Sequence, residues 1–148
     1  MRAFAIALIC RLLIGCATPA PSSSPAPPRQ PPVPLEVTNR TALPSCGSER
    51  ATTQLGPWNQ TGRDCFLLAY REQRPAEFTR TQLTTEGDPI TSIYRIIDRD
   101  RVEVFIDSTK DRFGSGGWLR LKCPTLAIVE APAPDFGPDN SCAETPLS

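Results

Sequence analysis

Four segments between residues 77 and 123 alternate apolar and polar side chains, and this pattern constrains the fold more than any other feature of the chain. They read "EFTRTQLTT", "ITSIYRIID", "RVEVFIDST" and "GWLRLKC". A period of two is typical of a strand with one buried face. The last two segments each place three apolar residues on one face: Val102, Val104 and Ile106, then Leu119, Leu121 and Cys123. Because the polar breaks "EGDP" and "DRDR" suit hairpin turns, the sequence predicts a four-stranded antiparallel meander.

One helix is predicted ahead of these strands. Thr61 and Asp64 form a T-x-x-D capping arrangement, and the run "CFLLAYREQR" behind it is rich in helix formers and ends before Pro75. A helix that covers the apolar face of a meander gives a two-layer α+β fold, of which a cystatin-like arrangement is one form. We assign this domain to residues 37–131, where the last apolar stretch, "TLAIVEA", extends the sheet or crosses its edge.

The N-terminus resembles a bacterial lipoprotein signal. The apolar run at residues 3–10 is shorter than the roughly 20 residues that a transmembrane helix needs. Leu13 to Cys16 matches the lipobox, in which a small residue precedes a cysteine that is acylated before cleavage on its amino side. We predict a signal peptide at 1–15 and a lipidated, palmitate-bearing Cys16 that anchors the chain to the cell membrane. An ordinary cleaved secretory signal is the alternative, because Arg11 interrupts the apolar run.

Composition separates the domain from two flanking segments. Residues 16–36 hold the lipidated cysteine and a tether that contains eight of the chain's 17 prolines. Such a segment favours extended polyproline II structure and buries no core. Residues 132–148 are expected to be a tail held by a disulfide. Without residues 1–15 the chain has 14 basic and 16 acidic residues, so nucleic acid is not expected as a partner.

Four cysteines remain in the exported part, namely Cys46, Cys65, Cys123 and Cys142. An even number of cysteines in an oxidising compartment predicts two disulfides. Of the three pairings we favour the nested one, with Cys65–Cys123 inside Cys46–Cys142, because it joins the helix to the last strand. Zinc is the alternative use, but the chain has no histidine and no CxxC spacing.

Two stretches carry a resemblance to a known family. "TTEGDPITSIYRI" and "VEVFIDSTKDRFGSGGW" are similar to the signature of a family of bacterial lipoprotein domains of unknown function. In that family a Glu-Gly-Asp-Pro-Ile turn precedes an Asp-x-Thr-x-Asp-x-Phe-Gly loop, and the resemblance covers residues 62–126. It implies an exported domain and supplies no catalytic residue.

Four carboxylates lie in these two stretches. Glu86 and Asp88 follow the first predicted strand, while Asp107 and Asp111 follow the third, so a meander brings both pairs to one end of the sheet. Three roles are open for them. They build turns and cap backbone amides, they bind a ligand or a metal such as calcium, or they act as acid and base. Turn building has the greatest weight, because the D-x-x-x-D spacing is not that of a known calcium loop.

The chemistry available points away from an enzyme. With no histidine there is no Ser-His or Cys-His pair, and no serine stands in a GxSxG elbow. We therefore expect a lipid-anchored envelope protein that faces the extracytoplasmic space and acts as a non-catalytic binding module without a cofactor. Its expected partner is an envelope protein or glycan. The alternatives are a hydrolase of envelope polymers that uses the four carboxylates and a structural accessory subunit of an envelope complex.

Overall fold

The computed structural model describes residues 31–51, 58–114, 116–130 and 135–148. Within these ranges the main sheet has six strands in the order β1-β2-β3-β4-β5-β8, and β6 pairs with β7 in a separate hairpin. The elements are α1 (Leu35–Thr38), β1 (Ser45–Arg50), α2 (Gln60–Arg71), β2 (Ala76–Leu83), β3 (Pro89–Asp98), β4 (Arg101–Asp107), β5 (Trp118–Cys123), β6 (Leu126–Val129), β7 (Asp135–Pro138) and β8 (Ala143–Leu147). Neither helix is long or apolar enough to cross a membrane.

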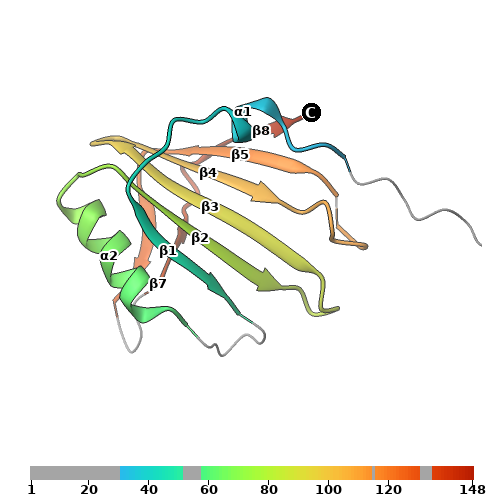
Figure 1. Cartoon of the computed structure of the whole chain (residues 1–148), viewed down its shortest axis with the longest axis horizontal. Coiled ribbons are helices and arrows are strands. Elements are labelled where there is room, and N and C mark those ends of the chain that lie inside the picture. The colour runs from blue at the N-terminus through green and yellow to red at the C-terminus, as the bar shows by residue number, and fades with distance from the viewer. Residues whose placement is uncertain (1–30, 52–57, 115, 131–134) are drawn as a thin grey trace, which may run out of the picture.

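Helix α2 and the β6–β7 hairpin cover one face of the sheet (Figure 1). The main core lies between them, and Phe136 of β7 is its centre. The ring of Phe136 stacks on Phe66 of α2 at 4.7 Å and meets Phe78 and Tyr94 of the sheet edge-on at 5.7 and 5.1 Å. All four rings are at least 96% buried. The helix is amphipathic, and this face of the sheet receives its apolar side.

The opposite face of the sheet carries a smaller core under α1. Val37 of α1 packs with Ile93, Phe105 and Trp118, one from each of three neighbouring strands, and with Leu147. The sheet is therefore covered on both faces, and β3, β4 and β5 each contribute buried apolar residues to both cores. This explains why the continuous run "IYRII" in β3 is mostly buried.

The α+β fold with disulfides is confirmed, but the sheet has six strands rather than the four expected. The four predicted strands form β2 to β5 in antiparallel order. Their predicted faces are confirmed too, because Val102, Val104 and Ile106 lie opposite Cys123, Leu121 and Leu119. Strands β1 and β8 were missed since "SCGSER" and "AETPL" lack alternating apolar residues and are mostly exposed.

The segment expected to be a tail belongs to the fold. Residues 135–138 form β7 with Phe136 in the core, and residues 143–147 form the edge strand β8. Of the two alternatives for "TLAIVEA", extension of the main sheet is wrong, because β6 pairs with β7 in a separate hairpin. A single phenylalanine between Pro and Gly residues gives no periodic signal, which is why pattern reasoning placed the segment outside the domain.

The helix begins two residues earlier than the T-x-x-D arrangement indicates. Asn59 is its N-cap, and the Asn59 Oδ1 atom accepts a hydrogen bond from the Gly62 backbone N–H at 3.0 Å. The Asn59 Nδ2 atom donates to the Ser48 carbonyl at 2.9 Å, so the same side chain ties the helix start to β1. Asn is as good a cap as Thr, and the tertiary contact decides between them.

The disulfides pair neighbours in sequence, so the nested pairing is wrong. Cys46 joins Cys65, and Cys123 joins Cys142, each across a separation of 19 residues. The first bond links β1 to α2, and the second links the end of β5 to the loop before β8. The predicted Cys46–Cys142 bond does not form, because Cys46 lies in β1 and Cys142 lies just before β8, and these strands are at opposite edges of the sheet.

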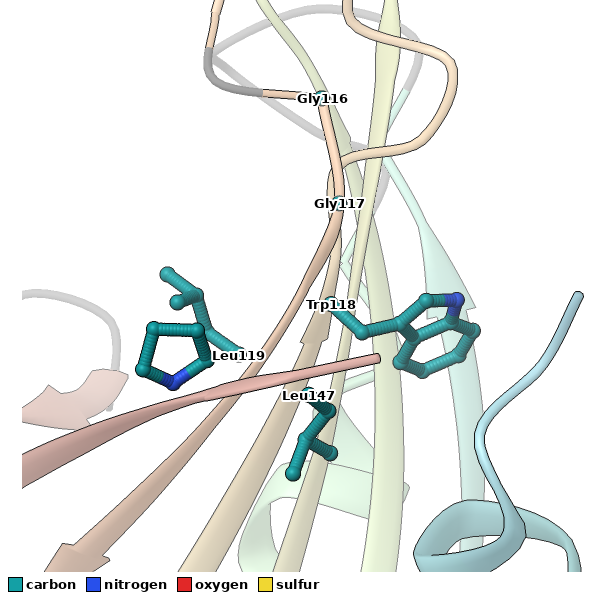
Figure 2. Close-up of a pocket in the computed structure, with 6 residues that line it drawn as sticks. Gly116, Gly117, Trp118, Leu119 and Leu147 are labelled. Carbon is teal, nitrogen blue, oxygen red and sulfur yellow. The ribbon is translucent and has the colours of Figure 1, made fainter. Parts of the chain in front are cut away.

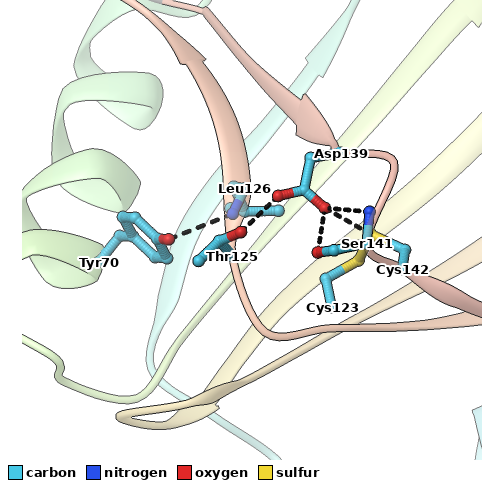
Figure 3. The surroundings of a disulfide bond; sticks show 7 residues. All are labelled: Tyr70, Cys123, Thr125, Leu126, Asp139, Ser141 and Cys142. Carbon is cyan, nitrogen blue, oxygen red and sulfur yellow. Dashed lines mark hydrogen bonds between the residues drawn. A yellow bond between two sulfur atoms is a disulfide. The ribbon is translucent and has the colours of Figure 1, made fainter.

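Polar contacts order the loop around the second disulfide (Figure 3). The Asp139 carboxylate accepts from the Ser141 N–H at 2.8 Å and from the hydroxyls of Thr125 and Ser141. These hydrogen bonds hold the pKa of Asp139 below its ordinary value. Tyr70 of α2 accepts a hydrogen bond from the Leu126 N–H at 3.1 Å. Helix, hairpin and disulfide are therefore joined at one place.

Each disulfide should stabilise the fold independently. We expect the double variant Cys123→Ala/Cys142→Ala to lower the free energy of unfolding by about 3 kcal/mol, since it reopens a loop of about 20 residues. Cys46→Ala/Cys65→Ala should have a similar effect, measured by urea denaturation. Peptide mapping of the oxidised chain supplies the control. A peptide that links Cys65 to Cys123 would contradict the pairing.

Candidate functional site

The two carboxylate-bearing stretches meet at one end of the sheet, as predicted. The turn at residues 84–88 and the loop at 108–117 are joined by Asp88 and Arg112. Both oxygens of the Asp88 carboxylate accept from the Arg112 Nε atom, at 2.9 and 3.1 Å, and one accepts from the Arg112 backbone N–H at 3.0 Å. Asp88 is buried and its charge is neutralised by an exposed guanidinium.

The other three carboxylates are spread along these loops. The Asp107 carboxylate accepts from the backbone and hydroxyl of Thr109, at 2.9 and 2.7 Å. Asp111 accepts from the backbone N–H groups of Phe113 and Gly114. Glu86 is exposed, and its backbone carbonyl lies 3.5 Å from Arg112. Asp88, Asp107 and Asp111 thus serve in turn building, the role that had the greatest weight. In the ranges that the structure describes, no group of three or more Cys, Asp or Glu residues is placed to hold a metal ion.

The β4–β5 loop, residues 108–117, is fixed at its base. The Ser108 hydroxyl and the Ser108 backbone N–H both donate to the Gly117 carbonyl at 2.9 Å. The Gly117 backbone N–H donates in return to the Ser108 hydroxyl oxygen at 3.1 Å. Farther along, Gly114 has no room for a side chain, because a Cβ atom there would lie 2.2 Å from the Asp111 carboxylate. The Asp-x-Phe-Gly motif is therefore a capped turn whose glycine permits the carboxylate to approach.

The capped turn presents an aromatic ring to solvent. Phe113 is 74% exposed, the largest exposed fraction among the large hydrophobic residues described. The Arg112 guanidinium lies 5.6 Å from the centre of the Phe113 ring, so the residue that clamps the loop to the β2–β3 turn also touches the exposed ring. Scattered exposed hydrophobic residues are common, but this one directly follows Arg112, which is held by the Asp88 carboxylate.

Next to this loop lies a pocket between β5 and β8 (Figure 2). It has a volume of about 300 Å³ and is lined by Gly116, Gly117, Trp118, Leu119, Pro146 and Leu147. Figure 2 shows Leu119 on one side of β5 and the indole of Trp118 on the other. The volume is at the lower end for small-ligand sites and fits an apolar side chain. The loop and the pocket share the Gly116–Gly117 segment.

A second polar cluster, here called the Glu49 cluster, is buried in the domain. The Glu49 carboxylate accepts from Arg63 of α2 at 2.7 and 2.8 Å and from Arg80 of β2 at 2.7 Å. Asp135 of β7 pairs with Arg80 at 2.8 Å and with Arg63 at 3.4 Å. The Arg80 guanidinium also lies over the Phe136 ring at 4.7 Å. The charges balance within the cluster, and it joins β1, α2, β2 and β7.

The environment of Glu49 favours its ionised form. Burial alone disfavours the charge, but the hydrogen bond from Arg63 and the positive charges of Arg80 and Arg63 outweigh it, so the pKa of Glu49 lies below its ordinary value. Glu77 on the other face is similar. Burial opposes its ionisation, and hydrogen bonds from Arg40 and Arg95 lower its pKa overall. These clusters were missed from the sequence since Glu and Arg on short strands usually indicate exposed positions.

The lipidation prediction at Cys16, the signal peptide at 1–15 and most of the tether at 16–36 lie outside the described residues. Comparison with known proteins adds no relative. No family model matches the chain, and no curated protein or solved structure is similar to it. The resemblance to a lipoprotein family and the cystatin-like arrangement therefore stay predictions, and the site rests on its geometry.

The Glu49 cluster predicts how stability depends on pH. Because the folded pKa of Glu49 lies below 4.5, its contribution is complete above that pH and is lost as the pH falls through the folded pKa. At pH 7 we expect Glu49→Gln to lower the free energy of unfolding by about 3 kcal/mol, because it leaves two buried arginines with only the half-exposed Asp135 carboxylate as a counter-charge. Urea denaturation at pH 7 and at pH 3 should show a smaller difference between variant and wild type at the lower pH.

Glu72→Gln is the matched control for this prediction. Glu72 pairs with Arg74 at the surface, where both side chains are about half exposed, so the variant should change stability by less than about 1 kcal/mol at either pH. An unchanged gap between Glu49→Gln and wild type from pH 7 to pH 3 would contradict the ionised cluster.

Proposed function

We propose that the chain is an envelope lipoprotein, anchored through Cys16, whose domain is a non-catalytic binding module for another envelope protein. The proposal combines the N-terminal sequence pattern with the loop and pocket at one end of the sheet. A tether of about 20 residues in extended form would hold the domain roughly 50 Å from the lipid surface. The similarity to exported lipoprotein domains is part of the same proposal and supplies no ligand.

The observation that carries the proposal is a loop that exposes Phe113 and shares Gly116 and Gly117 with a pocket between β5 and β8. Interfaces derive much of their affinity from aromatic anchors and filled pockets. A loop held by Asp88, Arg112 and the Ser108–Gly117 pair loses little conformational entropy on binding. An exposed aromatic side chain, and a pocket lined by Trp118, Leu119, Pro146 and Leu147 at the same end of the sheet, suit a protein partner that offers apolar side chains.

A protein partner is favoured over a glycan by the placement of the tryptophan. Trp118 is 8% exposed, and its ring packs against Val37, Ile93 and Phe105 beneath α1. It does not offer an open ring face on which a sugar stacks. The hydrolase alternative gains no specific support, since Asp88, Asp107 and Asp111 already hold the loops in place.

Site-specific photocross-linking tests the proposed surface. With p-benzoylphenylalanine at position 113 in the full-length protein, irradiation of intact envelopes should give one discrete adduct. Leu68 on α2 is the control position, because it is 49% exposed and lies on the helix rather than on the loop. Adducts at position 68 alone, or equal adducts at both positions, would contradict a binding surface at the loop.

The lipid anchor is tested separately. Cys16→Ser should abolish incorporation of radiolabelled palmitate and release the protein from the membrane fraction, because the thiol carries the acyl group. Cys10→Ser is the matched control and should keep the label, since position 10 lies in the predicted signal peptide. Retained label in Cys16→Ser would show that the anchor prediction is wrong while leaving the binding surface untouched.

A further inference from the structure

Arg120 of β5 differs from the buried arginines of this domain. Arg63, Arg80 and Arg95 are each at least 97% buried, and each pairs with one or more carboxylates. Arg120 has no ion pair and no hydrogen bond from its side chain within the part of the chain that the structure describes. Its Nε atom is the one buried side-chain nitrogen or oxygen there that lacks a partner. Such groups are rare in folded proteins and need a physical explanation.

The strand register places Arg120 beside the pocket. Arg120 lies opposite Thr145 of β8, and the next pair on the same face is Trp118 with Leu147, which lines the pocket. Two residues along a strand correspond to about 7 Å, a distance that the long arginine side chain spans. One ligand can therefore contact the pocket and the guanidinium together.

The carboxylates nearest to Arg120 in the register are already engaged. Phe105 lies opposite Arg120 on β4, so Glu103 and Asp107 occupy the diagonal positions. Glu103 accepts from Arg95 at 3.2 Å, and Asp107 accepts from Thr109. Lys122, the next residue of β5 on this face, is exposed and lies opposite Glu103. Arg120 has no such counter-charge, because Phe105 and Thr145 lie opposite it on the two neighbouring strands.

We propose that Arg120 recognises a carboxylate of the bound partner, next to an apolar side chain that enters the β5–β8 pocket. The Arg120 Nε atom is buried and out of a ligand's reach, but the two terminal Nη groups are not buried and have no hydrogen-bond partner among the described residues. Their parallel N–H groups match the two oxygens of a carboxylate. The partner segment is therefore an apolar residue followed by a carboxylate, either an acidic side chain or a chain end. This inference rests on the proposed binding function and specifies its ligand.

Peptide titrations of the full-length, acylated protein in dodecyl maltoside micelles test the inference. The probes are N-acetyl-Leu-Glu-amide, its Gln counterpart, and N-acetyl-Leu with a free carboxylate, followed through the backbone amides of Gly116, Gly117 and Trp118 by NMR. We expect at least one carboxylate peptide to bind about tenfold more tightly than the Gln peptide. Whichever of the two binds more tightly identifies the source of the carboxylate.

Two variants separate recognition from folding. Arg120→Met should remove the preference for carboxylate. It should leave the melting temperature unchanged or higher, since the substitution breaks no side-chain hydrogen bond or ion pair in the described part of the domain. Arg120→Lys keeps the charge but not the paired N–H groups and should lose most of the preference. Arg95→Met is the control and should lower the melting temperature, because it removes the buried guanidinium that pairs with both Glu77 and Glu103.

The outcomes distinguish this inference from the proposed function. Equal binding of the Glu, Gln and free-acid peptides would overturn the role of Arg120 and leave the pocket as a binding site. No shift with any peptide would overturn both. A fall in melting temperature for Arg120→Met as large as that for Arg95→Met would show that Arg120 is structural and would overturn the inference alone.

Discussion

The Glu49 carboxylate, held between two buried arginines, is the interaction on which the arrangement of the domain depends. Glu49 lies on β1, and its two arginine partners come from α2 and β2, so the cluster joins three separate segments of the chain. Asp135 then connects the same arginines to β7. A buried charge is tolerated only when it is fully paired, so moving any one of these elements would leave a charge unpaired. The cluster therefore specifies the arrangement even where its net contribution to stability is small.

The parallel pairing of β1 with β2 follows from the same constraint. A parallel pair needs a crossover, and α2 supplies it. Strand β1 has few apolar residues to bury, so hydrophobic burial alone holds it weakly. Three specific links compensate: the Glu49 carboxylate, the Asn59 side chain bound to Ser48, and the Cys46–Cys65 disulfide. At the other edge, β8 is equally exposed and is held by the disulfide at Cys142 and by its ladder to β5.

Part of this structure can be predicted from the pattern of apolar and polar residues in the sequence. Strands β2 to β5 were predicted with their faces and nearly their bounds, because alternation is strong wherever a strand has an apolar face. The meeting of Asp88 with the 108–117 loop also followed from meander order. The edge strands, the core residue Phe136 and the disulfide pairing did not follow, since each depends on long-range contacts that leave no periodic signal. The unusual environment of Arg120 could not be predicted either, because a single arginine in a strand is usually a solvent-exposed charge.

The two ends of the sheet have different physical roles. Near α2 and the β6–β7 hairpin, the aromatic rings are buried against one another, and the Glu49 cluster pairs its own charges. Few of the described groups there are free to bind a ligand. At the opposite end, Phe113 is exposed, a pocket lies open, and the terminal Nη groups of Arg120 have no carboxylate partner among the described residues. Pro146 in the edge strand β8 has no N–H to offer to an added strand, which disfavours strand addition at that position. Side-chain contacts are therefore the more favourable mode of docking here, and an apolar group with a neighbouring carboxylate suits both the pocket and Arg120.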